Sequence, residues 1–265
     1  MTAGNTPPEP GDRPRRAPAI TAAGTLTGWL GTIRVRQADD DARGTIRELI
    51  PHGPGLGEFV LRFSALTVLS AAIAAFGLLA DSGAVVIGAM LVAPLMTPIL
   101  AGAAATVTAD NRLLLRSLAI IALGTVLAIA VGWIVGFIAA VHVVDVGALP
   151  DEIRSRTFPG LLDLGIAISA GAAAGYIQPR RSAISALPGV GIAVALVPPL
   201  AAVGITAQLG LGAEARNAFL LYLTNLAAII FSAGIVLLAT GFRPRPSYTS
   251  AVLDAPSPLT TSWPP

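Results

Sequence analysis

The apolar stretches of this sequence hold few side chains that could do chemistry, and those few carry only hydroxyl or amide groups. Asn225 is the strongest candidate among them, because a buried amide can donate and accept hydrogen bonds at the same time. Its alternative role is an interhelical hydrogen bond, which is worth roughly 0.6–2 kcal/mol in a membrane. No Asp, Glu, His or Lys lies clearly in the middle of an apolar stretch, so relay of protons through buried acids is poorly supported. The full set of candidates is Ser70, Thr97, Thr106, Ser169, Thr224 and Asn225.

Two copies of a short proline motif mark where these groups would act. Leu91-Val92-Ala93-Pro94-Leu95 reappears as Leu196-Val197-Pro198-Pro199-Leu200. A proline has no N–H, and its ring clashes with the carbonyl four residues earlier. In lipid an unpaired backbone group is costly, so a break must face other protein or a water-lined cavity, and broken helices of this kind are the usual binding architecture of secondary transporters. The alternative is that the prolines are packing kinks, which are common in membrane helices.

The pattern predicts a pathway between the second and fifth apolar spans. Its lining residues would be Pro94, Thr97, Pro98, Pro198, Pro199 and Asn225. Charged residues near the predicted outer ends are candidates for its entrance, namely Asp81, Glu152, Arg156 and Asp163. These charges could also pair locally or simply be solvated, and solvation is the default for charges at a surface.

The composition places the chain among polytopic membrane proteins. Of its 265 residues, 54% are hydrophobic, 12% are charged and none is Cys. The two histidines, His52 and His142, lie outside the spans, and there is no Walker loop. The sequence therefore predicts no enzyme, metal site or cofactor. All 17 basic residues are Arg and most flank apolar runs, which indicates determinants of membrane topology rather than a nucleic-acid surface.

Six stretches have the roughly 20 apolar residues that a membrane-spanning helix needs. They predict an all-α fold, a polytopic bundle of six spans. Two glycine pairs, Gly132-x-x-x-Gly136 and Gly171-x-x-x-Gly175, predict close approach of helix backbones. The predicted spans are Phe59–Ala80, Gly83–Thr108, Arg112–Ala140, Leu161–Ile177, Ser185–Gln208 and Ala218–Gly241.

The arginines orient the bundle in the cytoplasmic membrane. With both termini inside, the inner segments hold 14 of the 17 arginines and the outer segments hold 3, in agreement with the positive-inside rule. Residues 1–58 are then a cytoplasmic N-terminal region, 59–241 the spans and 242–265 a disordered cytoplasmic tail. Residues 1–20 are expected to be disordered, and 25–50 form a basic amphipathic element. That element would either lie on the inner membrane face and contact anionic lipid or dock on the spans.

A shift of 105 or 106 residues superimposes parts of the two halves. Asp110-Asn111-Arg112 falls on Arg216-Asn217-Ala218, and Gly136-Phe137 falls on Gly241-Phe242. Spans one to three therefore look like a copy of spans four to six. Because three is odd, the copies would have opposite orientations, which is an inverted-topology repeat with a proline-broken helix in each half.

Several motifs resemble a known family. The run from Leu79 to Met96 is similar to the signature of the bacterial and archaeal membrane family known as domain of unknown function 389. Ser155-Arg156-Thr157, Leu187-Pro188-Gly189-Val190, Val197-Pro198-Pro199-Leu200 and Leu223-Thr224-Asn225-Leu226 also resemble it. The resemblance implies a multi-pass inner-membrane protein and implies no particular activity.

Two functions fit these observations. The first is a transporter or channel for a small solute or ion, with unwound carbonyls suited to a cation and half-helix N-termini suited to an anion. The second is a membrane scaffold or assembly protein without transport, in which the glycine-rich spans pack a homo-oligomer and the N-terminal arginines bind lipid or a partner.

Overall fold

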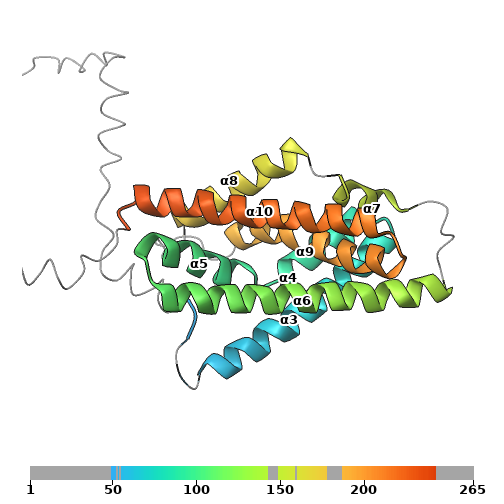
Figure 1. The fold of residues 1–265 in the computed structure, drawn as a ribbon, viewed down its shortest axis with the longest axis horizontal. Coiled ribbons are helices and arrows are strands. Elements are labelled where there is room, and N and C mark those ends of the chain that lie inside the picture. The colour runs from blue at the N-terminus through green and yellow to red at the C-terminus, as the bar shows by residue number, and fades with distance from the viewer. Residues whose placement is uncertain are drawn as a thin grey trace, which may run out of the picture. The chain divides into compact units, whose positions relative to one another are not determined.

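The structure is a computed structural model that describes residues 49–51, 53, 55–142, 149–158, 160–177 and 187–242. Every regular element among these residues is an α-helix (Figure 1), so the predicted all-α class is confirmed for the described part of the chain. The predictions for residues 1–48 and 243–265 lie outside the described residues. In chain order the helices are α3 (Gly55–Leu79), α4 (Gly83–Val92), α5 (Met96–Thr108), α6 (Asn111–His142), α7 (Asp151–Arg156), α8 (Leu161–Ile177), α9 (Leu187–Gln208) and α10 (Gly212–Ala239).

Three of these helices, α3, α6 and α10, are long and apolar enough to cross a membrane. α4 and α5 together make a fourth such segment, which is bent by 61° between them. α8 and the Leu196–Gln208 part of α9 are apolar but shorter. Large apolar side chains such as Leu61, Val126 and Phe231 are exposed, which suits a surface covered by lipid. The chain is therefore a helical membrane protein.

The break predicted at Pro94 is present. α4 ends at Val92, α5 begins at Met96, and Ala93 between them is extended, with φ −69° and ψ 122°. A proline pushes the residue before it out of the helical region, so Pro94 accounts for the end of α4. Pro98 plays no part in the break. It lies in the first turn of α5, where the N–H groups have no partner within the helix and a proline loses nothing.

The matching break predicted at Pro198 and Pro199 is wrong. α9 runs without interruption from Leu187 to Gln208, with both prolines inside it. Both are buried, and α3, α6 and α10 all pack against α9. Packing on several sides supports a membrane helix through prolines, because neighbouring helices take over the stabilisation that the missing hydrogen bonds would have given.

Four helices end in a left-handed turn that is closed by the same kind of hydrogen bond. The residue at positive φ is Asp81 after α3, Ala109 after α5, Gly210 after α9 and Gly241 after α10. In each turn the next residue's N–H donates to a carbonyl five residues earlier, as in Ser82 to Gly77 and Asp110 to Ala105. This is a Schellman ending. The turns at Asp81 and Ala109 fold α4 back along α3 and α6 back along α5.

Glycines bring two pairs of helices into backbone contact, as their spacing predicts. A Cβ added to Gly132 of α6 would lie 2.5 Å from the Ala201 carbonyl oxygen of α9. A Cβ added to Gly175 of α8 would lie 2.7 Å from the Ala233 carbonyl oxygen of α10. No real Cβ approaches an atom that closely, so only glycine fits at these crossings. The predicted packing role of the two glycine pairs is confirmed.

Candidate functional site

The α4–α5 break lies where three helices meet. A Cβ added to Gly124 of α6 would lie 3.5 Å from a Leu95 methyl carbon and 2.9 Å from the Phe63 ring of α3. Leu95 and Phe63 are both buried, whereas Pro94 beside them is half-buried. Gly124 therefore leaves room for the irregular backbone between α4 and α5, because a larger residue there would displace the aromatic ring.

The next residue of α6 connects this region to α10. The Thr125 hydroxyl oxygen lies 2.6 Å from the Tyr222 hydroxyl oxygen, and Thr125 also donates to the Ile121 carbonyl oxygen at 2.8 Å. A threonine has one hydroxyl proton, so Tyr222 must be the donor in the bond between the two side chains. This bond links a helix of the first half of the chain to a helix of the second half, close to the break.

Contacts along α5 and α10 place the predicted pathway residues at one depth. Val107 of α5 lies 3.6 Å from the Cβ position of Gly234 on α10. Residues of these two helices whose numbers differ by 127 therefore lie side by side. The same offset puts Leu95 level with Tyr222, in agreement with the contacts of both residues around Gly124 and Thr125. Thr97, which is half-buried, is then level with Thr224 and next to the depth of Asn225, which is 3% exposed. The structure thus brings Pro94, Thr97 and Asn225 to neighbouring depths.

Pro198 and Pro199 lie further along the bundle. Gly132 contacts Ala201 and Gly136 contacts Ile205, so α6 and α9 are parallel with an offset of 69 residues. Pro199 is then level with residue 130 of α6, five residues beyond Thr125. At 1.5 Å per residue this is about 7–8 Å. The same offset puts Val194 of α9, rather than the prolines, level with Thr125. The Val194 carbonyl lacks its usual helical donor, because Pro198 has no N–H.

Other polar candidates have partners inside their own helices. The hydroxyl groups of Thr106, Ser169 and Thr224 donate to carbonyls four residues earlier, at 2.8–2.9 Å. Such bonds satisfy the proton of the hydroxyl without a ligand. These three residues therefore stay candidates only as passive lining, and Thr125 and Tyr222 are the polar groups that sequence reasoning missed. One of the two could have been found from the sequence, because Tyr222 is three residues from the candidate Asn225 and therefore shares its helix face.

Three of the four entrance candidates come together at one end of the bundle. The Asp81 carboxylate accepts a hydrogen bond of 2.8 Å from the Glu152 backbone N–H, and Arg156 pairs with Glu152 at 3.2 Å within α7. The N-cap of α7, Pro150, offers no capping side chain, so Asp81 caps α7 from the α3–α4 turn. Asp163 instead accepts from the Gly160 N–H at 3.1 Å, at the start of its own helix α8.

We expect Asp81→Ala to loosen α7 from the α3–α4 turn. The change removes the acceptor for the Glu152 N–H, and loss of a helix cap costs about 1 kcal/mol. It also places an alanine at a position with left-handed backbone conformation, which alanine adopts less readily than Asp or Asn. A fall in melting temperature, with faster proteolysis within residues 143–160, would be the readout. Asp81→Asn keeps an oxygen acceptor and should recover most of the loss; equal losses in both variants would contradict the capping role.

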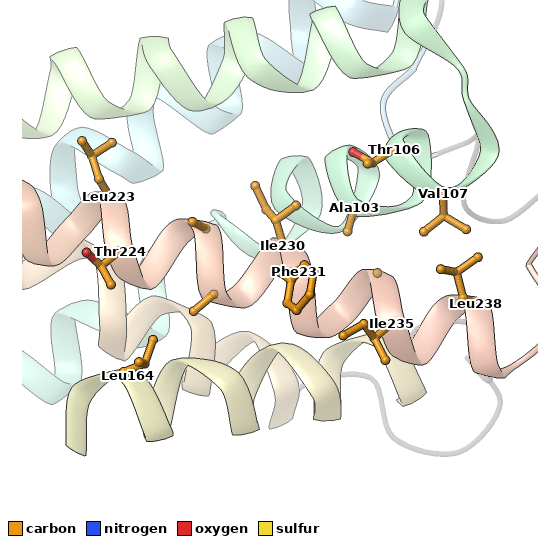
Figure 2. Close-up of a pocket in the computed structure, with 13 residues that line it drawn as sticks. Ala103, Thr106, Val107, Leu164, Leu223, Thr224, Ile230, Phe231, Ile235 and Leu238 are labelled. Atoms are coloured by element: carbon orange, nitrogen blue, oxygen red, sulfur yellow. The ribbon is translucent and has the colours of Figure 1, made fainter. Parts of the chain in front are cut away.

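A second feature is a groove that runs along α10, with α5 on one side and α8 on the other. It has a volume of about 1070 Å³. In Figure 2, side chains of α10 such as Phe231 and Ile235 line it between Leu164 of α8 and Ala103 of α5. Its two hydroxyl residues, Thr106 and Thr224, already donate within their helices. The groove therefore suits an apolar occupant and offers little to a polar solute.

Comparison with known proteins agrees with the motifs. Residues 90–231 match the family described as domain of unknown function (DUF389). An uncharacterised protein of Methanocaldococcus jannaschii is 31% identical over 179 residues, which are 68% of this chain and 54% of that relative. The chain thus spans about half the length of this relative. No solved structure matches the chain. The matched range begins in the last turns of α4, crosses the break and ends in α10, and the chain belongs to the DUF389 family.

Proposed function

We propose that this protein passes a small solute or ion across the bacterial inner membrane, along a pathway beside the α4–α5 break. The observation that carries the proposal is the break itself, a 61° bend at Pro94. Irregular backbone at membrane depth needs protein or water around it rather than lipid. Pro94 and Thr97 are only half-buried, which leaves that backbone accessible from one side. Pro98, Pro198, Pro199 and Asn225 are buried and would support the wall behind it.

We infer six crossings with both termini on the cytoplasmic side, and one hydrogen bond together with one loop length supports the first three of them. The Asp81–Glu152 hydrogen bond ties the α3–α4 turn to α7, so these two lie at the same membrane face. Eight residues join α6 to α7 and reach at most about 28 Å, which is less than the roughly 48 Å length of 32 helical residues. These lengths support an α6 that ends at that face too, and they favour one crossing by α4 with α5 over a re-entrant loop.

The pairing of helices also supports the inverted repeat. α3 packs on α4 and α6, and α8 packs on α9 and α10 in the corresponding way. Between the halves, α6 packs on α9 while α10 packs on α5. If α3 is matched with α8, α4–α5 with α9, and α6 with α10, the contact of α6 with α9 corresponds to the contact of α10 with α5. A pseudo-two-fold axis in the membrane plane would relate the two sets, with only the first retaining a broken span.

The proposal is tested by the access of water to single cysteines, because the chain has no natural Cys. Thr97→Cys should react with a membrane-impermeant maleimide. Val126→Cys is the matched control, since Val126 lies at the same depth but is 65% exposed on the outside of the bundle, where lipid would protect it. Labelling of both, or of neither, would remove the pathway from this position. Solute or ion flux into proteoliposomes, with Pro94→Ala and Asn225→Ala, then measures whether the accessible route conducts.

The second candidate function is a scaffold that assembles with itself or another membrane protein without transport. The groove between α5, α8 and α10 favours it, because the groove is large and apolar and its two threonine hydroxyls already donate within their helices. In that function the N-terminal arginines would contact anionic lipid, and no catalytic step or cofactor would be involved. A protein that stays unlabelled at Thr97→Cys and forms a stable homo-oligomer in detergent would favour the scaffold.

A further inference from the structure

The end of α4 at the break presents carbonyl oxygens without helical donors. The last four carbonyls of an α-helix have no partner within it, and they carry the negative end of the helix dipole. Pro94 cannot donate to the Met90 carbonyl because it has no N–H. Ser70 of α3 donates to the Ala89 carbonyl oxygen at 2.7 Å. A hydroxyl of α3 therefore already contacts the last turn of α4, next to the carbonyls that the break leaves without helical donors.

One turn away from Ser70, α3 carries a buried hydroxyl without a partner. Thr67 is 2% exposed, and its hydroxyl oxygen has no hydrogen-bond partner among the described residues. Thr106, Thr108 and Thr125, by contrast, each donate to a carbonyl four residues earlier. A buried hydroxyl without a partner is costly, so a ligand at this position would stabilise the fold.

The register of α3 and α4 places Thr67 at the break. These helices are antiparallel, with Ser70 opposite Ala89. Beyond the end of α4, Leu95 lies next to Gly124 of α6, and so does Phe63 of α3. Thr67 is then opposite Val92, the last residue of α4. The Thr67 and Ser70 hydroxyls and the free carbonyls of the last turn of α4 share one small region. Since Ser70 gives its only proton to Ala89, its oxygen can act there only as an acceptor.

We propose that these oxygens bind a dehydrated alkali-metal cation at the α4 end of the break. The ligands would be the Thr67 hydroxyl, the Ser70 hydroxyl and the Met90 carbonyl, with other carbonyls of the last turn. Carbonyl ends of half-helices are suited to such ions, and hard cations prefer oxygen ligands. No group of three or more Asp, Glu, His or Cys residues lies together in the described residues, so a neutral oxygen set favours a singly charged ion over a divalent one.

The cation site rests on the proposed transport function for its meaning, but it can be tested without measuring transport. A ligand that binds only the folded state raises the melting temperature as its concentration rises. We expect the melting temperature of the detergent-purified protein to rise by several degrees when choline chloride is replaced by NaCl or KCl at equal ionic strength. The salt that raises the melting temperature more, NaCl or KCl, identifies the preferred ion.

The matched variants are Thr67→Val and Thr206→Val. Both threonines are buried, but Thr206 donates to the Ala202 carbonyl oxygen within its own helix and should not contact the ion. Thr67→Val should abolish the ion-dependent rise, Thr67→Ser should restore it, and Thr206→Val should keep it. An equal response to NaCl, KCl and choline chloride, or an unchanged response in Thr67→Val, would overturn the site.

The two proposals fail in different ways. An ion-dependent melting temperature that needs Thr67, with no labelling of Thr97→Cys, would keep the cation site and remove the pathway. Labelling of Thr97→Cys without any dependence on the alkali cation would keep the pathway and remove the cation site.

Discussion

Gly204→Ala is expected to destabilise the fold by about 3 kcal/mol, which is at the upper end for overpacking. A Cβ on Gly204 would lie 2.3 Å from the Ile129 carbonyl oxygen and 2.5 Å from the Trp133 backbone nitrogen. These atoms belong to the backbone of α6 and cannot move aside as a flexible side chain would. α6 and α9 would have to separate along their length, which would disturb the contacts of Gly132 and Gly136 as well. The readout is the melting temperature together with the fraction of monodisperse protein after detergent extraction.

Gly165→Ala is the matched control for this change. Gly165 is an exposed residue of α8 with no atom within 4 Å of its Cβ position. In a helix, alanine is favoured over glycine by up to about 1 kcal/mol, so this variant should be neutral or slightly stabilised. If the two variants had the same melting temperature, the close approach of α6 and α9 would be wrong.

The Thr125–Tyr222 bond should respond unequally to the loss of its two partners. Tyr222→Phe removes the donor, but Thr125 keeps its bond to the Ile121 carbonyl, so the expected cost is that of one membrane hydrogen bond, about 0.6–1.7 kcal/mol. Thr125→Val removes the acceptor and leaves the Tyr222 hydroxyl, on a side chain that is 3% exposed, without its partner. That change should cost about 1–3 kcal/mol.

The double variant separates this explanation from simple loss of packing. When Tyr222→Phe is already present, Thr125→Val no longer leaves a buried tyrosine hydroxyl without an acceptor. The double variant should therefore be nearly as stable as Tyr222→Phe alone. Additive costs in the double variant, or a larger cost for Tyr222→Phe than for Thr125→Val, would contradict the assigned donor. Melting temperatures of all four proteins in one detergent provide the cycle.

The two proline motifs show how far the sequence could predict this fold. A proline's missing N–H is a local property, and it correctly predicted the end of α4 at Pro94. The same rule failed at Pro198 and Pro199, where buried contacts with α3, α6 and α10 support a continuous helix. Whether a proline breaks a membrane helix depends on the neighbours that compensate for it, and these neighbours come from distant parts of the chain.

The candidate site was predicted in part for a related reason. Pro94, Thr97 and Asn225 could be selected because polar groups and prolines are rare in apolar spans, and the structure puts them at neighbouring depths. Thr125 and Tyr222 could not be selected in this way, since their role comes from a hydrogen bond across 97 residues of sequence. The grouping of Asp81 with Glu152 likewise arises from a turn and a helix cap 71 residues apart.

The glycine crossings have a mechanical consequence. At α6–α9 and at α8–α10, backbone touches backbone, so neither member can slide or rotate past its partner without a steric collision. Each pair must move as a single rigid body. Three residues separate Val92 from Met96 and lie outside both helices. Leu95 among them accepts one helical hydrogen bond, from the Ile99 N–H at 3.4 Å, and Pro94 can donate none. These residues join a helix of ten residues to a helix of thirteen. If the bundle opens, the change of angle therefore costs least free energy at Pro94, while the pairs α6–α9 and α8–α10 stay fixed.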